Sequence, residues 1–184
     1  MSETNMKASN YDLGYRILHW LMAILILLML LAVMGFASVT NNQEHMEMLM
    51  GHSSLGTLVG LFLILRIFKR FIKKSPIPEQ DLPKLQQRVA KTVQYALYGL
   101  MVWIPVTGYL TARFHELPVM AFGRFNLSNA SQTMYNPELF DALRLGHEIG
   151  TKLIMVLLVL HIGGAFYHKL VKKDQVMRSM TGSK

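Results

Sequence analysis

One apolar stretch, residues 145–172, is long enough to cross a bilayer and carries three histidines, His147, His161 and His168. A hydrocarbon core about 30 Å thick requires roughly 20 helical residues. His161 follows His147 by fourteen residues, close to four turns of α-helix, so the two imidazoles share one face about 21 Å apart. One metal ion cannot bind both. The stretch therefore predicts two separate sites stacked through the membrane, each requiring a second ligand from elsewhere in the chain.

Four stretches of the 184-residue chain qualify as membrane spans by length and apolar content: 17–39, 49–68, 92–112 and 145–171. The first run is too long, and the residues before it too weakly basic, for a cleaved signal peptide. Residues 40–48 are expected to form the first outer loop. We predict an all-α fold, an integral membrane four-helix bundle in which residues 1–184 form a single domain. Pro105 is expected to kink the third helix or end its regular part, and residues 119–125 to cap the bundle.

The distribution of charge sets the expected topology. A net charge of +8 would favour nucleic acid in a soluble protein, but fifteen of the 19 Lys and Arg residues lie before the first span, between the second and third, or after the fourth. The remaining four accompany six acidic residues in the other connections and at the start of the fourth span. This pattern predicts a multi-pass protein with both termini in the cytoplasm and basic residues against membrane lipid, not nucleic acid. The absence of cysteine excludes disulfides and thiolate ligands.

In this topology, four histidines lie at two matching depths in the membrane and so form two pairs. His19 lies near the inner end of the first span and His52 at the outer start of the second. The fourth span runs inward, so His147 lies level with His52, and His161 with His19. Two imidazoles facing each other in a helical bundle are the axial ligands of a six-coordinate haem, whose porphyrin supplies four nitrogens. We therefore predict two haem b sites, one near each face of the membrane.

An isolated histidine near a membrane interface is most often an ordinary hydrogen-bonded group. Ionisable groups inside spans are nevertheless rare, and four of them matching in depth on three helices favours the haem interpretation. His45 and His115 lie on predicted loops and are expected to be surface residues.

Several glycines lie near these histidines in the sequence. Gly56 and Gly60 continue from His52 at intervals of four, on one helical face. Such a strip either leaves room for a flat ring or permits close helix packing. Other small residues expected to leave space for the rings are Gly146, Gly150, Gly163 and Gly164.

Charged side chains near the expected membrane boundaries are candidates for binding the haem propionates. Arg16 and Lys169 lie at the inner side, and Lys152 or Arg144 at the outer side. His168 shares the face of His161 and could hold a propionate, bind a quinone headgroup or contact water. Arg66 lies at the inner end of the second span, where its long side chain can reach the boundary.

Several motifs in the chain are similar to those of the bacterial cytochrome b561 family, the di-haem, four-helix inner-membrane cytochromes grouped with the cytochrome b subunits of nickel–iron hydrogenases. They are R-I-L-H-W at 16–20, G-H-S-S-L-G at 51–56, P-V-T-G at 105–108, A-F-G at 121–123, H-E-I-G at 147–150 with His161, and the tail 173–182. The resemblance implies His19, His52, His147 and His161 as haem ligands. Two departures are Gln94, where members often have histidine, and Lys169, where many have a second histidine after His168.

The leading hypothesis is a di-haem cytochrome of the bacterial inner (plasma) membrane that transfers electrons to or from a quinone, as in a respiratory chain. A family member oxidises superoxide at the periplasmic face and reduces ubiquinone, so the resemblance implies this oxidoreductase activity as a candidate. Six acidic and four basic residues on the outer side would attract such an anion only weakly. The alternatives are an electron-transfer anchor subunit for a separate dehydrogenase or hydrogenase, and a haem-free small transporter or scaffold. The sequence leaves the catalytic residues, the electron donor and the oligomeric state open.

Overall fold

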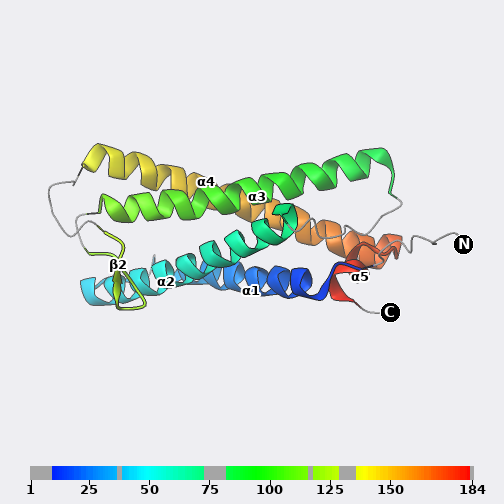
Figure 1. The fold of residues 1–184 in the computed structure, drawn as a ribbon. Coiled ribbons are helices and arrows are strands. Elements are labelled where there is room, and N and C mark those ends of the chain that lie inside the picture. The colour runs from blue at the N-terminus through cyan, green and yellow to red at the C-terminus, as the bar shows by residue number, and fades with distance from the viewer. Residues whose placement is uncertain (1–9, 37–38, 73–81, 116–117, 129–135, 183–184) are drawn as a thin grey trace, which may run out of the picture.

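The computed structural model describes residues 10–36, 39–72, 82–115, 118–128 and 136–182. Four long helices lie along a common direction (Figure 1): α1 (Leu13–Phe36), α2 (Asn42–Ile67), α3 (Lys84–Arg113) and α4 (Pro137–Tyr167). A π-helical turn extends α2, as η1 (Phe68–Ile72), and another extends α4, as η3 (His168–Lys172). A short helix, α5 (Val176–Thr181), follows η3, and β1 (Met120–Ala121) pairs antiparallel with β2 (Phe125–Asn126). The prediction of a helical protein is confirmed, with one small hairpin added.

Three of the long helices are apolar and long enough to cross a membrane. These segments are Leu13–Gly35, Asn42–Arg70 and Pro137–Lys172. In α3, tyrosine, threonine, glutamine and proline interrupt the apolar residues, which lowers its hydropathy. The crossing expected over residues 92–112 therefore stays a prediction.

Helices α2 and α4 begin well before their apolar stretches, at asparagine N-caps. The Asn41 side chain accepts a hydrogen bond from the Glu44 amide at 2.8 Å, and the Asn136 side chain accepts one from the Leu139 amide at 3.0 Å. Asparagine is a strong N-cap because its side-chain oxygen satisfies an amide that has no partner within the helix. The assignment of residues 42–48 to a loop is thus wrong, because Asn41 starts α2 while the chain is still polar.

The long helices pack as two pairs, α1 with α2 and α3 with α4 (Figure 1). Two glycines let α4 approach α3. The Trp103 indole nitrogen donates to the Gly146 carbonyl at 3.0 Å, and a Cβ at Gly150 would lie 2.9 Å from Trp103 Cδ1 and 3.1 Å from Ile104 Cγ1. The expectation that Gly146 and Gly150 leave space for cofactor rings is therefore wrong, because α3 fills that space.

The hairpin β1–β2 covers the beginning of α2. The Ser53 hydroxyl donates to the Met120 carbonyl at 2.6 Å, and the Phe122 amide donates to the Ser54 hydroxyl at 2.7 Å. Its turn requires positive φ at Phe122 (55°) and Gly123 (64°), an arrangement that suits right-twisted hairpins. The two serines that follow His52 thus hold the segment that was expected to cap the bundle.

The C-terminal helix α5 lies beside the start of α1 (Figure 1). The Trp20 indole donates to the Met180 carbonyl at 3.2 Å, and the Tyr11 amide donates to the Ser179 carbonyl at 3.1 Å. The two ends of the described chain therefore meet at one end of the bundle. The cytoplasmic location of that end stays a prediction.

Substitution Gly150→Ala is expected to destabilise the α3–α4 pair by about 1–3 kcal/mol, the usual cost of overpacking, because the new methyl group meets Trp103 and Ile104. The matched control is Gly99→Ala in α3, where a Cβ meets no described atom within 4 Å and alanine raises helix propensity. Thermal unfolding in detergent should give a lower Tm for Gly150→Ala and an unchanged or higher Tm for Gly99→Ala. Equal Tm values would contradict close packing at Gly150.

Candidate functional site

Two pairs of histidine rings connect α4 to the other helix pair. The ring centroids of His52 and His147 lie 6.1 Å apart with planes at 77°, and those of His19 and His161 lie 6.2 Å apart with planes at 70°. These are the same couples that the depth argument predicted. Within the described helices, α4 approaches α3 closely along its length but has little close backbone contact with α1 or α2. The imidazoles therefore meet across helices that otherwise stand apart.

The separation within each pair can be compared with that of two imidazoles bound to one iron. A ring nitrogen bonds such a metal at about 2.0 Å and lies about 1.2 Å from its own ring centre, so centroids on opposite sides of one iron are about 6.4 Å apart. The two observed distances, 6.1 and 6.2 Å, agree closely with this value. Among the described residues no group of three or more His, Cys, Asp or Glu could hold a metal ion. A pair suits iron in a porphyrin, which needs only two protein ligands.

The ring of His147 is held by the backbone of α3. Its Nδ1 lies 2.9 Å from the Ile104 carbonyl oxygen and 3.4 Å from the Thr107 hydroxyl. A carbonyl can only accept, so Nδ1 carries the proton and Nε2 keeps a lone pair for a metal. A Cβ at Gly108 would lie 3.0 Å from the His147 Cε1 atom, so only glycine leaves the ring its full room.

The P-V-T-G motif thus contributes to the binding pocket of the His147 ring. Its members Thr107 and Gly108 lie beside the ring, and α3 continues through Pro105 to Arg113. Of the two alternatives, the prediction that the regular helix would end at Pro105 is wrong, and the kink stays a prediction. Sequence reasoning treated this motif as a kink and missed Ile104, Thr107 and Gly108, although the motif lies at the outer level of His147.

Gly56 and Gly60 are not used for close helix packing. A Cβ at Gly56 would approach only Met29 Cε, at 3.8 Å, and a Cβ at Gly60 would meet no described atom within 4 Å. At Gly150, by contrast, the corresponding contact falls below 3 Å. The open strip after His52 therefore favours room for a flat ring over a helix-packing motif.

Arg66 is a residue whose position sequence reasoning misjudged. Its side chain is only 7% exposed, whereas the sequence suggested that it would reach the membrane boundary. Its Nε donates to the Tyr98 hydroxyl at 3.0 Å and its Nη2 to the Tyr15 hydroxyl at 3.3 Å. The sequence does indicate that Arg66 faces the interior. Arg66 follows His52 by the same fourteen residues that separate His147 from His161, so it lies on the same face of α2 as His52.

Other predicted site residues have different neighbours. The Arg16 guanidinium lies against Gly182 in the C-terminal turn. Lys152 forms an exposed ion pair with Glu148 at 2.7 Å, one helical turn away. His115, expected to be an ordinary surface residue, packs edge-on against Phe140 with centroids 5.2 Å apart.

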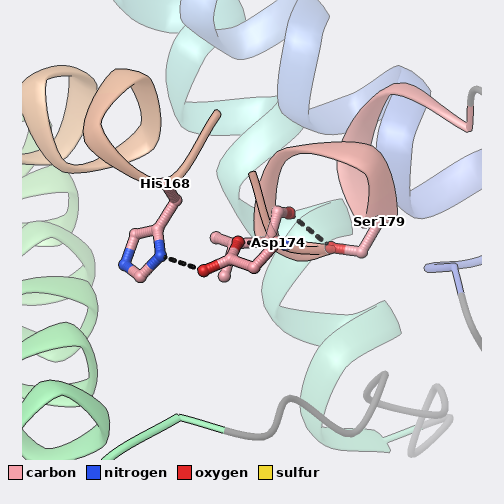
Figure 2. Close-up of polar contacts among 4 residues, drawn as sticks. His168, Asp174 and Ser179 are labelled. Carbon is pink, nitrogen blue, oxygen red and sulfur yellow. Dashed lines mark hydrogen bonds and ion pairs between the residues drawn. The ribbon is translucent and has the colours of Figure 1, made fainter. Parts of the chain in front are cut away.

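His168 joins α4 to the C-terminal helix, as Figure 2 shows. Its Nδ1 lies 2.6 Å from Asp174 Oδ2, and Asp174 Oδ1 accepts from the Val176 amide at 3.0 Å. The buried Ser179 hydroxyl donates to the Val176 carbonyl at 2.7 Å. These contacts support an anchoring role for His168, which differs from the propionate, quinone and water contacts that the sequence suggested.

The apolar helices and the paired imidazoles define the class of a helical membrane cytochrome. The family model described as prokaryotic cytochrome b561 matches residues 10–183, and the chain belongs to that family. The chain is also 27% identical over 132 residues to Cytochrome b561 homolog 2 of Escherichia coli (strain K12), a match that covers 71% of this chain and 69% of the relative. The protein is accordingly a bacterial membrane b-type cytochrome that binds haem b, associates with lipid and functions in electron transfer.

Substitution Gly108→Ala should displace the His147 ring and weaken haem binding, because the added methyl group would lie only 3.0 Å from the His147 Cε1 atom. The reduced-minus-oxidised spectrum of purified protein should show a weaker b-type α-band than that of the wild type. Gly99→Ala on the same helix should leave the spectrum unchanged. An intact spectrum for Gly108→Ala would show that the His147 ring does not require glycine at position 108.

Proposed function

We propose that this chain binds two haem b groups, one between His52 and His147 and the other between His19 and His161, and carries electrons across the bilayer. The observation that supports this most directly is the pair of ring-centroid distances, 6.1 and 6.2 Å, each close to the value for two imidazoles on one iron. Bound haem supplies the one-electron redox chemistry, and the protein supplies ligands, orientation and electrostatics.

Four membrane crossings with both termini in the bacterial cytoplasm complete the proposal. The fourth crossing is α3, whose apolar part packs against α4. The meeting of α5 with the start of α1 supports placing both termini on the same side. The concentration of Lys and Arg at that end favours the cytoplasm.

The residues around each pair have distinct tasks. The Ile104 carbonyl fixes the tautomer of His147 and makes its free nitrogen a stronger donor. The open strip at Gly56 and Gly60 gives a flat ring access to the α2 backbone. The hairpin held by Ser53 and Ser54 covers the outer end of α2 beside His52. These features position a disc-shaped cofactor between the two helix pairs.

The finer part of the proposal concerns the electron donor and acceptor. We propose a quinone, with ubiquinone as the candidate, as the acceptor, because a bilayer-soluble carrier can reach a bundle whose surface is mostly apolar helix. Superoxide at the outer face is the candidate donor. A separate redox subunit is the competing donor, in which case the chain would serve as a membrane anchor.

Pyridine haemochrome analysis of purified protein should give two haems per chain. Substitutions His52→Ala and His147→Ala should each leave one, because the remaining pair uses different side chains. His19→Ala and His161→Ala should give the same count by removing the other site. One haem per wild-type chain would contradict the di-haem proposal, and none would leave the haem-free alternative.

Purified protein in detergent should be reduced rapidly by superoxide and reoxidised by ubiquinone, without added protein partners. The single-histidine variants should lose this turnover because each interrupts the path across the membrane. The control is reduction by dithionite, which the remaining haem of each variant should retain. If superoxide gives no reduction while a co-purifying subunit does, the anchor function replaces the oxidase function.

A further inference from the structure

Arg66 is a buried cation without an acidic partner in the described part of the chain. Its side chain is 7% exposed, and no carboxylate among the described residues forms an ion pair with it. Its Nη1 atom is buried and finds no hydrogen-bond acceptor among the described residues. The guanidinium therefore presents one nitrogen that the rest of the described structure does not satisfy.

Two tyrosines hold this guanidinium in place but do not neutralise it. The Tyr15 and Tyr98 hydroxyls, 3.1 Å apart, accept from Nη2 and Nε respectively. The guanidinium carbon also lies 4.6 Å from the centroid of the Tyr15 ring, within range of a cation–π contact. A charge inside an apolar bundle costs several kcal/mol unless an opposite charge accompanies it. A neutral phenol leaves most of that cost in place.

The position of Arg66 relates it to one histidine pair. Its side chain donates to the hydroxyl of Tyr15, which lies one helical turn before His19 on α1. Fourteen residues separate Arg66 from His52 on α2, so it lies on the same helical face about 21 Å along the axis. His161 follows His147 on α4 by the same fourteen residues. Arg66 therefore lies on the His52 face of α2, at the level of the pair His19 and His161, which is called the inner pair below.

We propose that Arg66 is the counter-charge of a propionate of the haem bound between His19 and His161, with Tyr15 and Tyr98 as the residues that orient it. This inference rests on the proposed function, since it requires a haem at that pair. The guanidinium is suited to the task because it stays ionised and can donate two parallel hydrogen bonds to a carboxylate. Arg66 is a positioning residue, because it acts on the cofactor's side groups and the tyrosines act through it.

The first test measures the reduction potential of the inner site. Ferric haem carries one more positive charge than ferrous haem, so a nearby cation favours the reduced form. In a His52→Ala background, which retains only the inner haem, Arg66→Gln should lower the midpoint potential and Arg66→Lys should restore most of it. The control Arg88→Gln removes an exposed cation from the start of α3 and should leave the potential unchanged. The double variant Tyr15→Phe with Tyr98→Phe, which keeps the charge, should shift it less than Arg66→Gln.

The second test identifies the anion. Protein is produced with haem isotopically labelled at its propionate carboxyl carbons, and redox-difference infrared spectra are recorded on the intact protein. Arg66→Gln should shift a labelled carboxylate band, and Arg88→Gln should not. Unchanged labelled bands in Arg66→Gln, with a shift confined to lipid phosphate or quinone vibrations, would overturn the propionate assignment.

The two proposals fail in distinguishable ways. A wild-type protein that lacks haem at the inner pair, shown by an unchanged haem count after His19→Ala, would remove the di-haem function itself. A protein with two haems, in which Arg66→Gln changes neither the inner potential nor the labelled bands, would refute only the role of Arg66.

Discussion

The rings of two histidines on α4 join this helix to the other half of the bundle. Helices α3 and α4 pack through glycines and Trp103, and α1 packs with α2, but close backbone contact between the halves is limited in the described structure. The imidazoles of His147 and His161 extend across that separation to His52 and His19. The spacing of fourteen residues on α4 therefore sets both the distance between the sites and the relative height of the other two helices.

Polar groups inside a bilayer must find partners within the protein, and this requirement explains much of the remaining detail. His147 reaches a backbone carbonyl of α3, the serines after His52 bond to the outer hairpin, and the His168–Asp174 contact ties the end of α4 to α5. The last two contacts join apolar helices to the hairpin and to α5, two segments that hydropathy alone would leave unplaced. The serine and His168 contacts determine how the hairpin and α5 lie on the ends of the bundle.

The helical fold and the histidine couples could be predicted because both depend on spacing along single helices. Hydropathy located the apolar parts but not the starts of α2 and α4, which Asn41 and Asn136 determine through side-chain caps. The sequence could not distinguish glycines that permit close helix packing from glycines that leave room for a ring. Gly150 packs against Trp103 while Gly60 faces open space, and only the rotation of each helix about its axis decides between these. The burial of Arg66 was missed for a similar reason, since a long side chain near a span end can turn either outward or inward.

The surroundings of the two histidine pairs differ in a way that bears on the direction of electron flow. At the outer pair, the Ile104 carbonyl accepts from His147, which increases the basicity of that ligand and favours the ferric state. At the inner pair, the buried Arg66 cation, placed one turn from His19 through Tyr15, favours the ferrous state. Given the proposed ligands, both effects raise the potential of the inner site relative to the outer one. Electrons that enter at the outer face would then move inward with a favourable free energy. That direction agrees with the proposed quinone acceptor and with the proposed cytoplasmic location of the end at which α1 and α5 meet.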